Sequence, residues 1–85
     1  MNEGHSYYIR TVTYHWIGTV AQVGEMFVAL ADASWIADGG RYSEAIMGPQ
    51  ALREVERVPV PVGVERASVV DWCPVAYDPA HVVTK

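Results

Sequence analysis

The sequence is poor in cysteine, in basic residues and in long apolar runs. Its 85 residues contain one cysteine, Cys73, which excludes an internal disulfide framework and fits a reducing compartment. Ten acidic residues against six basic ones give a net charge of −4, so the chain lacks the basic field typical of proteins that hold a long phosphate backbone. No apolar run reaches the roughly 18 residues of a membrane span, and the first residues do not resemble a signal peptide. We therefore expect a cytoplasmic protein with, at most, a local anion site.

Motifs for catalysis and metal binding are also missing. The three histidines, His5, His15 and His81, have no metal-ligand spacing, and no elbow or triad motif frames the serines and aspartates. Cys73 follows Trp72 directly, which favours a small buried hydrophobe over a nucleophile with an activating base. The sequence therefore predicts no enzyme, no metal and no cofactor.

Large apolar side chains are plentiful for so short a chain. Apolar residues make up 51% of the sequence, which includes three tryptophans and five tyrosines. A domain of this size has a large surface for its volume and cannot bury all of these side chains in one core. We expect the surplus at contacts between subunits, where aromatic residues are enriched. The alternative is a monomer with several exposed rings.

The pattern of residues in the first part of the chain predicts β-strands. Residues 7–16 are rich in aromatic and β-branched types and predict a first strand. Residues 17–22 predict a second strand, sharply bent at Gly18, and Gly24 supplies a turn. Residues 26–33 predict a third strand, and because both of its faces are apolar we expect it to be covered on both sides.

The second part of the chain predicts an insert, two closing strands and a tail. A short helix is expected over residues 41–47, while residues 51–58 fit either a helical turn or an extended polar edge. The prolines within residues 58–62 force an extended segment, at a sheet edge or outside the sheet. Further strands are predicted at residues 64–72 and 73–77, followed by a loose tail at residues 78–85. The whole chain, residues 1–85, is read as one domain with a variable insert at residues 34–61.

This order of elements is accompanied by short motifs. Gly18 lies in the bent strand, Met26 opens the third strand and Arg66 precedes the closing strand. Apolar residues accompany them at Val28, Leu30, Ala33, Val69 and Val70. The pattern, over residues 7–33 and 62–75, resembles the Sm-like (Hfq and LSm-type) small β-barrel family. The resemblance implies a mainly β fold: a five-stranded, strongly bent Sm-like or SH3-like barrel with one short helix in the insert, assembled into a homo-oligomeric ring.

Three positions depart from the Sm-like pattern. Val23 stands in place of an acidic residue, Phe27 in place of an asparagine and Ala67 in place of a glycine. In the family, the asparagine and the arginine help to form a uridine pocket, so the loss of the asparagine counts against RNA binding. The segment at residues 32–47 also resembles short phage-encoded proteins of unknown function, which places the protein in the cytoplasm of a bacterial host.

We therefore expect a non-enzymatic, phage-encoded ring protein that binds a small nucleotide-type ligand or a partner protein. One alternative is an Hfq-like chaperone that binds RNA. Another is a phage immune-evasion protein that sequesters a cyclic nucleotide signal.

Candidate ligand-binding residues surround the glycine turn at residues 39–40: Trp35, Arg41, Tyr42 and Ser43. Free amides at a helix start attract anions, arginine adds charge, and a Trp or Tyr face can stack on a base. Alternatively, Trp35 and Tyr42 pack between subunits while Arg41 pairs with a carboxylate. Arg66 is the remaining candidate, either as a pore-lining ligand contact or as the partner of a neighbour's carboxylate.

Overall fold

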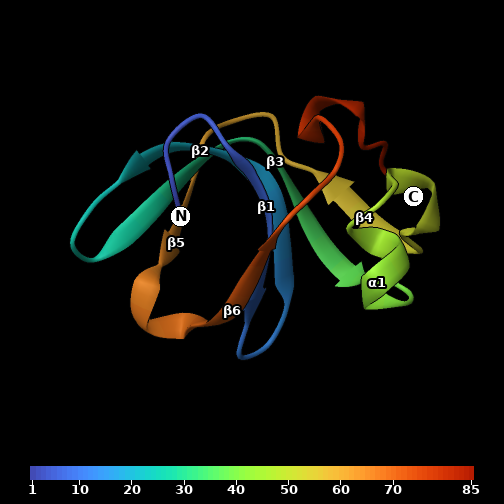
Figure 1. The fold of residues 1–85 in the computed structure, drawn as a ribbon, viewed down its shortest axis with the longest axis horizontal. Helices are drawn as coiled ribbons and strands as arrows, with labels where there is room; N and C mark the ends of the chain where they lie inside the picture. Colours follow the sequence, from blue (N-terminus) through green and yellow to red (C-terminus); the bar gives the residue numbers. More distant parts are fainter.

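Six antiparallel strands form one strongly curved sheet in the computed structural model, which describes residues 1–85 (Figure 1). The strands are β1 (Ser6–Thr11), β2 (His15–Val23), β3 (Phe27–Asp38), β4 (Glu54–Arg57), β5 (Val62–Glu65) and β6 (Val69–Pro74). Helix α1 (Tyr42–Ala45) and the 3-10 turns η1 (Pro49–Ala51), η2 (Arg66–Ser68) and η3 (Pro79–His81) connect or follow them. The sheet order is β4-β3-β2-β1-β6, and β5 pairs with the other half of the long strand β3. None of the helices has the length and apolar character needed to cross a membrane.

The sheet differs from the expected five-stranded barrel in strand number and in closure. Because β5 pairs only with β3, and β6 only with β1, the sheet remains open between β5 and β6. The sixth strand is β4, which lies where the sequence allowed either a helical turn or an extended polar edge. The extended alternative is correct, because Val55 points into a buried cluster while its neighbours Glu54 and Glu56 stay exposed.

Several predicted boundaries are wrong. The strand predicted over residues 7–16 is broken by a turn, in which the backbone N–H of Thr11 donates to Tyr14 O at 3.0 Å and the Thr11 hydroxyl accepts from Tyr14 N at 3.3 Å. A hydroxyl that closes a turn in this way competes with the β propensity of the same residues. The strand predicted over residues 64–72 is divided by η2, and residues 34–38 of the expected insert continue β3. The short helix predicted over residues 41–47 is confirmed as α1.

The predicted bend at Gly18 is confirmed, and Asp32 forms its other half. The register of β2 against β3 shifts between Ile17 and Thr19, opposite Asp32, whose φ of 50° lies in the left-handed region. Aspartate tolerates this conformation better than most residues. A Cβ at Gly18 would lie 3.0 Å from the Cβ of Leu30, so only glycine lets the two strands approach this closely.

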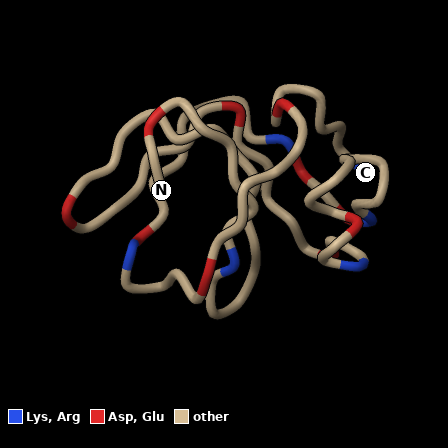
Figure 2. The backbone as a smooth tube through the Cα atoms, viewed as in Figure 1, with Lys and Arg blue, Asp and Glu red and all other residues tan.

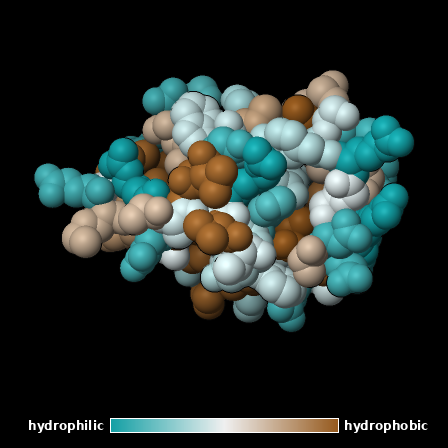
Figure 3. Space-filling view, turned by 90° about the horizontal axis from the view of Figure 1, so that it is seen from below, coloured by the Kyte–Doolittle hydropathy of each residue, from teal (hydrophilic) through white to brown (hydrophobic).

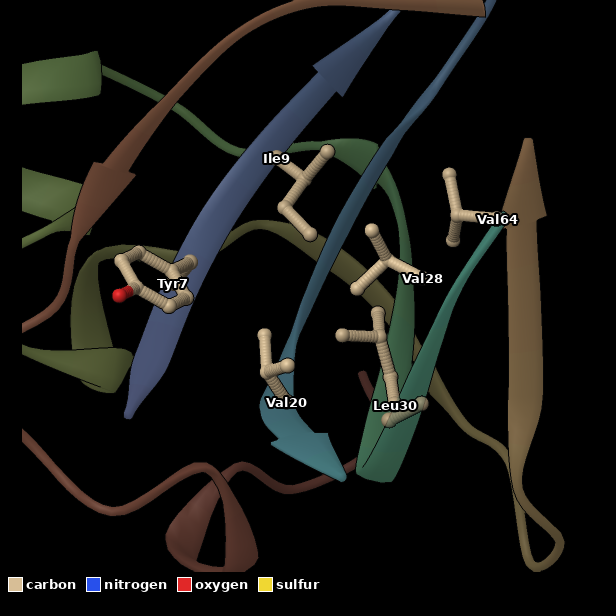
Figure 4. Close-up of a cluster of buried hydrophobic side chains, with 7 residues drawn as sticks. Tyr7, Ile9, Val20, Val28, Leu30 and Val64 are labelled. Carbon is tan, nitrogen blue, oxygen red and sulfur yellow. The ribbon is translucent and has the colours of Figure 1, made fainter. Parts of the chain in front are cut away.

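Alternate residues of the curved sheet build two apolar clusters on its opposite faces. The inner cluster, which the sheet wraps around, comprises Tyr7, Ile9, Val20, Val28, Leu30, Ala33 and Val64 (Figure 4). The outer cluster comprises Tyr8, Ile17, Ile36, Ala45, Leu52, Val55 and Val82. The expectation that residues 26–33 are covered on both sides holds for the inner face only, because Phe27 remains 44% exposed and the outer cover begins further along β3.

The C-terminal segment, expected to be a loose tail, packs on the outer face. Val82 is 3% exposed within the outer cluster, and Arg57 Nη1 donates to Pro79 O at 2.6 Å. Lys85 N donates to Val55 O at 2.9 Å, and Val55 N donates back to Lys85 O at 3.2 Å. Figure 1 shows the C-terminus beside β4. Two buried residues, Pro79 and Val82, and a pair of backbone hydrogen bonds thus fix a segment whose sequence carries no strand pattern.

Candidate interaction site

Three strands have an edge that faces away from the sheet, and the chain covers one of them. The outer edge of β4 is occupied by the C-terminal segment, through the exchange of hydrogen bonds between Val55 and Lys85 and a bond from Arg57 N to Thr84 Oγ1 at 3.0 Å. Neither β5 nor β6 has a second strand neighbour. The backbone groups on such edges are a template for pairing with another chain. The open region between β5 and β6, bridged by η2, is called the seam below.

The seam contains a pocket that reaches the inner cluster. Its volume is about 420 Å³, and its apolar lining consists of Met1, Val23, Val28, Val69, Val70 and Trp72. Trp72 pairs with Ile9 in the sheet, which places its ring on the inner face, edge-on to Tyr7 at 5.3 Å. Trp72 is still 46% exposed, because no strand closes the sheet beside it. Figure 3 shows hydrophobic side chains gathered on the face seen from below, the side on which η2 lies in Figure 1.

The charges around the seam are unequally matched. Asp71 lines the pocket, but its carboxylate accepts two hydrogen bonds from Arg10, one of them from Nε at 2.6 Å. This pairing holds the pKa of Asp71 below its ordinary value. Arg66, which also lines the pocket, donates from Nη1 to Gly24 O at 2.9 Å and forms no ion pair. Figure 2 shows that the lysine and arginine positions are scattered over the molecule, so the positive charge at the seam is local.

A polar and aromatic cluster lies on the outer face, where α1 meets β1 and β2. The Tyr8 hydroxyl lies 2.7 Å from His15 Nδ1, and the ring of Tyr42 meets that of Tyr8 edge-on at 5.2 Å. The guanidinium of Arg10 lies 5.2 Å from the centre of the Tyr42 ring. Burial raises the pKa of Tyr8 to about 12, while burial and the nearby Arg10 lower the pKa of His15. The Tyr8 hydroxyl and the His15 imidazole share one hydrogen bond, and Tyr42 of α1 packs on this pair.

The structure separates the residues predicted to form one ligand site. Trp35 pairs across the sheet with Trp16, and its ring lies 5.9 Å from that of Tyr14. Because Trp16 in turn pairs with Ile9, this group belongs to the inner face. Tyr42 instead contacts Tyr8 on the outer face.

The other predicted residues also lie apart. Arg41 and Ser43 are exposed at the start of α1, and Arg41 forms no ion pair with any carboxylate of the chain. Helix α1 has only four residues and no side-chain cap. Arg66 lies at the seam, far along the chain from this turn and on another element. Of the five predicted residues, Arg66 alone lines the largest pocket.

Sequence reasoning did not identify Trp72 and the Arg10–Asp71 pair as parts of a site. The exposure of Trp72 follows from the open sheet, which no local pattern reveals. In the folded chain the side chains of β6 alternate between half-buried and exposed, and Trp72 falls on an exposed position. The Arg10–Asp71 pair joins residues 61 positions apart and depends on the pairing of β1 with β6.

No group of three or more histidine, cysteine, aspartate or glutamate side chains is arranged to hold a metal ion. Cys73 is a free, half-buried thiol. No protein-family model matches the chain, and no curated protein or solved structure gives a significant match. The sheet edges, the pocket and the charges of this chain are therefore the features that bear on its function.

Proposed function

We propose that this protein is a non-enzymatic, Sm-like small β protein that assembles with copies of itself into a closed ring. The observation that carries the proposal is the distribution of sheet edges: the chain covers β4 with its own C-terminal segment and leaves β5 and β6 open. Proteins usually protect such edges with charge, proline or a covering segment. Exposed Val70 and Trp72 on β6 provide no such protection.

The two open edges favour head-to-tail assembly. They differ in sequence, Val62–Glu65 for β5 and Val69–Pro74 for β6, so pairing β5 of one copy with β6 of the next leaves a free edge at each end. Repetition of such a heterologous contact closes into a ring when the rotation permits. The next copy would also cover Trp72, in keeping with the enrichment of aromatic side chains at interfaces.

The chain order supports the Sm-like part of the proposal. The Sm-like order begins with a strand, a bent strand, a tight turn and a third strand, which here are β1, β2, the β2–β3 turn and β3. An insert follows, which here contains α1 and β4, and the two closing strands are β5 and β6. The open sheet places the two closing strands at the seam. In a ring, each seam would be completed by a neighbour, so closure would come from assembly.

The solution mass tests the assembly. The wild type is expected to exceed the 9.4 kDa of one chain severalfold in native mass spectrometry and light scattering. Val70→Lys, at a 62% exposed position on the β6 edge, is expected to yield a folded monomer, because a charged side chain blocks edge pairing. Val60→Lys, 60% exposed in the loop before β5, is the matched control and should keep the wild-type mass. A wild type that remains at the mass of one chain at micromolar concentration would overturn the proposal.

The second part of the hypothesis is that the ring binds a small nucleotide-type ligand. Of the five residues predicted to bind it, Arg66 alone lines the seam pocket. A ring would gather one Arg66 side chain from each copy at the seams. Thermal shifts with cyclic di- and trinucleotides, compared between the wild type, Arg66→Ala and Arg41→Ala, test this part. A shift that disappears only in Arg66→Ala supports nucleotide binding at the seam. The absence of any shift would contradict the nucleotide part of the hypothesis. Neither the scattered basic residues nor the net charge of −4 favours the RNA-chaperone alternative.

A further inference from the structure

The seam pocket combines a largely apolar lining with one arginine, Arg66, that forms no ion pair, although Glu25 and Glu65 lie in the adjoining pocket. Six of its eight lining residues are hydrophobic, and its volume of about 420 Å³ lies within the range of about 300 to 1,000 Å³ usual for small-ligand sites. The floor is Val28 of the inner cluster, and Trp72 forms part of the wall. The lining is mainly aliphatic, which suits a flexible hydrocarbon body better than a polar planar base.

The two charged residues of the lining make different contributions. Asp71 is neutralised by its two hydrogen bonds to Arg10 on the adjacent strand. Arg66 has one backbone acceptor, Gly24 O, for Nη1, and no carboxylate within ion-pair distance. Its remaining guanidinium N–H groups have no partner in the chain. An arginine in this state suits a carboxylate, to which its planar fork can donate two hydrogen bonds.

We propose that the seam pocket binds a small amphiphile made of one aliphatic chain and one carboxylate, with the chain against Val28 and Trp72 and the carboxylate on Arg66. A body of about seven carbon atoms, at about 30 Å³ for each carbon, roughly the share of a water molecule in the liquid, occupies about 210 Å³ and leaves room for the carboxylate. All residues of the pocket belong to a single copy of the chain.

Octanoate is the probe, with octan-1-ol and octylammonium as matched ligands of the same length. Binding is followed by titration in ¹H–¹⁵N NMR spectra, with the backbone signals of residues 69–72 and the indole N–H of Trp72 as reporters. Octanoate is expected to shift these signals in a saturable way. Octan-1-ol should bind about tenfold more weakly, because it loses the charge-assisted hydrogen bonds. Octylammonium should not bind, because its charge repels that of Arg66.

Variants assign the head group to Arg66. Arg66→Gln should reduce octanoate affinity to that of octan-1-ol, while Arg66→Lys, which keeps the charge but lacks the planar fork, should bind octanoate with an affinity between the two. Arg41→Gln, which removes an exposed arginine on α1, is the matched control and should bind as the wild type does. Val69→Trp, which fills the pocket, should abolish binding of both octanoate and octan-1-ol. Equal affinities for octanoate and octan-1-ol, an unchanged Arg66→Gln variant, shifts confined to other parts of the chain, or no saturable binding at millimolar octanoate would each overturn the proposal.

Discussion

Asp71 of β6 accepts two hydrogen bonds from the guanidinium of Arg10 on β1, and this pair ties the last strand to the sheet. It joins residues in register across the β1–β6 ladder. The same contact pairs the Asp71 carboxylate with a cation, whereas Arg66 forms no ion pair although Glu25 and Glu65 line a pocket with it. The attachment of the β6 edge to the sheet therefore depends in part on one ion pair.

Asp71→Asn is expected to lower the melting temperature at pH 7, because it removes the charge from this pair. Arg10 lowers the folded-state pKa of Asp71, so the stabilisation is present above the ordinary value of 3.8 and is lost as the pH falls through the folded pKa. The difference between variant and wild type should accordingly shrink in strong acid. Thermal unfolding at pH 7 and near pH 2 measures it. Glu25→Gln, an exposed acidic residue without an ion pair, should leave the melting temperature unchanged at pH 7.

His15 is expected to make the protein less stable in mild acid. Its folded-state pKa lies below the ordinary 6.5, mainly through burial, so the unfolded chain takes up the proton first. The stabilisation present above pH 6.5 is thus lost as the pH falls through 6.5 towards the folded pKa. Urea unfolding between pH 8 and pH 5 should show this loss, and His15→Gln should reduce it. His5→Gln, at an exposed position, should retain the wild-type profile.

Tyr8→Phe tests the partner of His15. The substitution removes the hydroxyl that lies 2.7 Å from His15 Nδ1 and keeps the ring in the outer cluster. We expect a loss of about 1 kcal/mol in the free energy of unfolding, the usual net contribution of such a hydrogen bond. Chemical denaturation at pH 8 measures it. A variant as stable as the wild type would show that the hydrogen bond contributes nothing.

Ser34→Ala is expected to stabilise the protein. The Ser34 hydroxyl oxygen is fully buried and has no hydrogen-bond partner. Burying an unsatisfied polar group costs about 1 to 3 kcal/mol, and alanine removes the group at the expense of a small void. A gain of about 1 kcal/mol in the free energy of unfolding is expected by chemical denaturation. The control is Ser43→Ala, an exposed serine on α1 that should change little. A destabilised Ser34→Ala would indicate a partner for the hydroxyl in solution.

Val82→Ala is expected to destabilise the protein by about 2 kcal/mol through lost burial and the cavity left in the outer cluster. The adjacent Val83 is 66% exposed, so Val83→Ala is the matched control and should change the free energy of unfolding by less than about 0.5 kcal/mol. Hydrogen exchange provides a second readout, because Val55 N–H bonds to Lys85 O and should lose protection only in Val82→Ala. Equal effects of the two substitutions would contradict the docking of this segment.

The sequence predicted the features that depend on neighbouring residues. The bend at Gly18 and the helix after residue 40 follow from glycine placement and short periodic runs, and the structure contains both. The β-rich composition correctly predicted a sheet. The turn after Thr11 was missed because its hydroxyl contact is a matter of geometry, while the residue types favour a strand.

Features that depend on distant pairing were not predictable in the same way. Residues 78–85 dock because Val82 meets a cluster built from β1, β2, β3 and β4, and no local pattern marks a single valine as an anchor. The predicted ligand site failed to assemble for a related reason. Trp35 and Tyr42 are close in the sequence, but β3 directs Trp35 to the inner face while α1 folds Tyr42 back over the outer face.

The division of the apolar residues into an inner and an outer cluster affects how the protein tolerates substitution. The chain seals the outer cluster by itself, whereas the inner cluster opens at the seam. Exposed residues at the seam, such as Val70 and Trp72, contribute no buried side chain to the outer cluster. Their replacement should change what the seam recognises while most of the folding energy is preserved. Recognition at the seam can therefore change through exposed side chains while the buried residues of both clusters, and the stability they provide, stay the same.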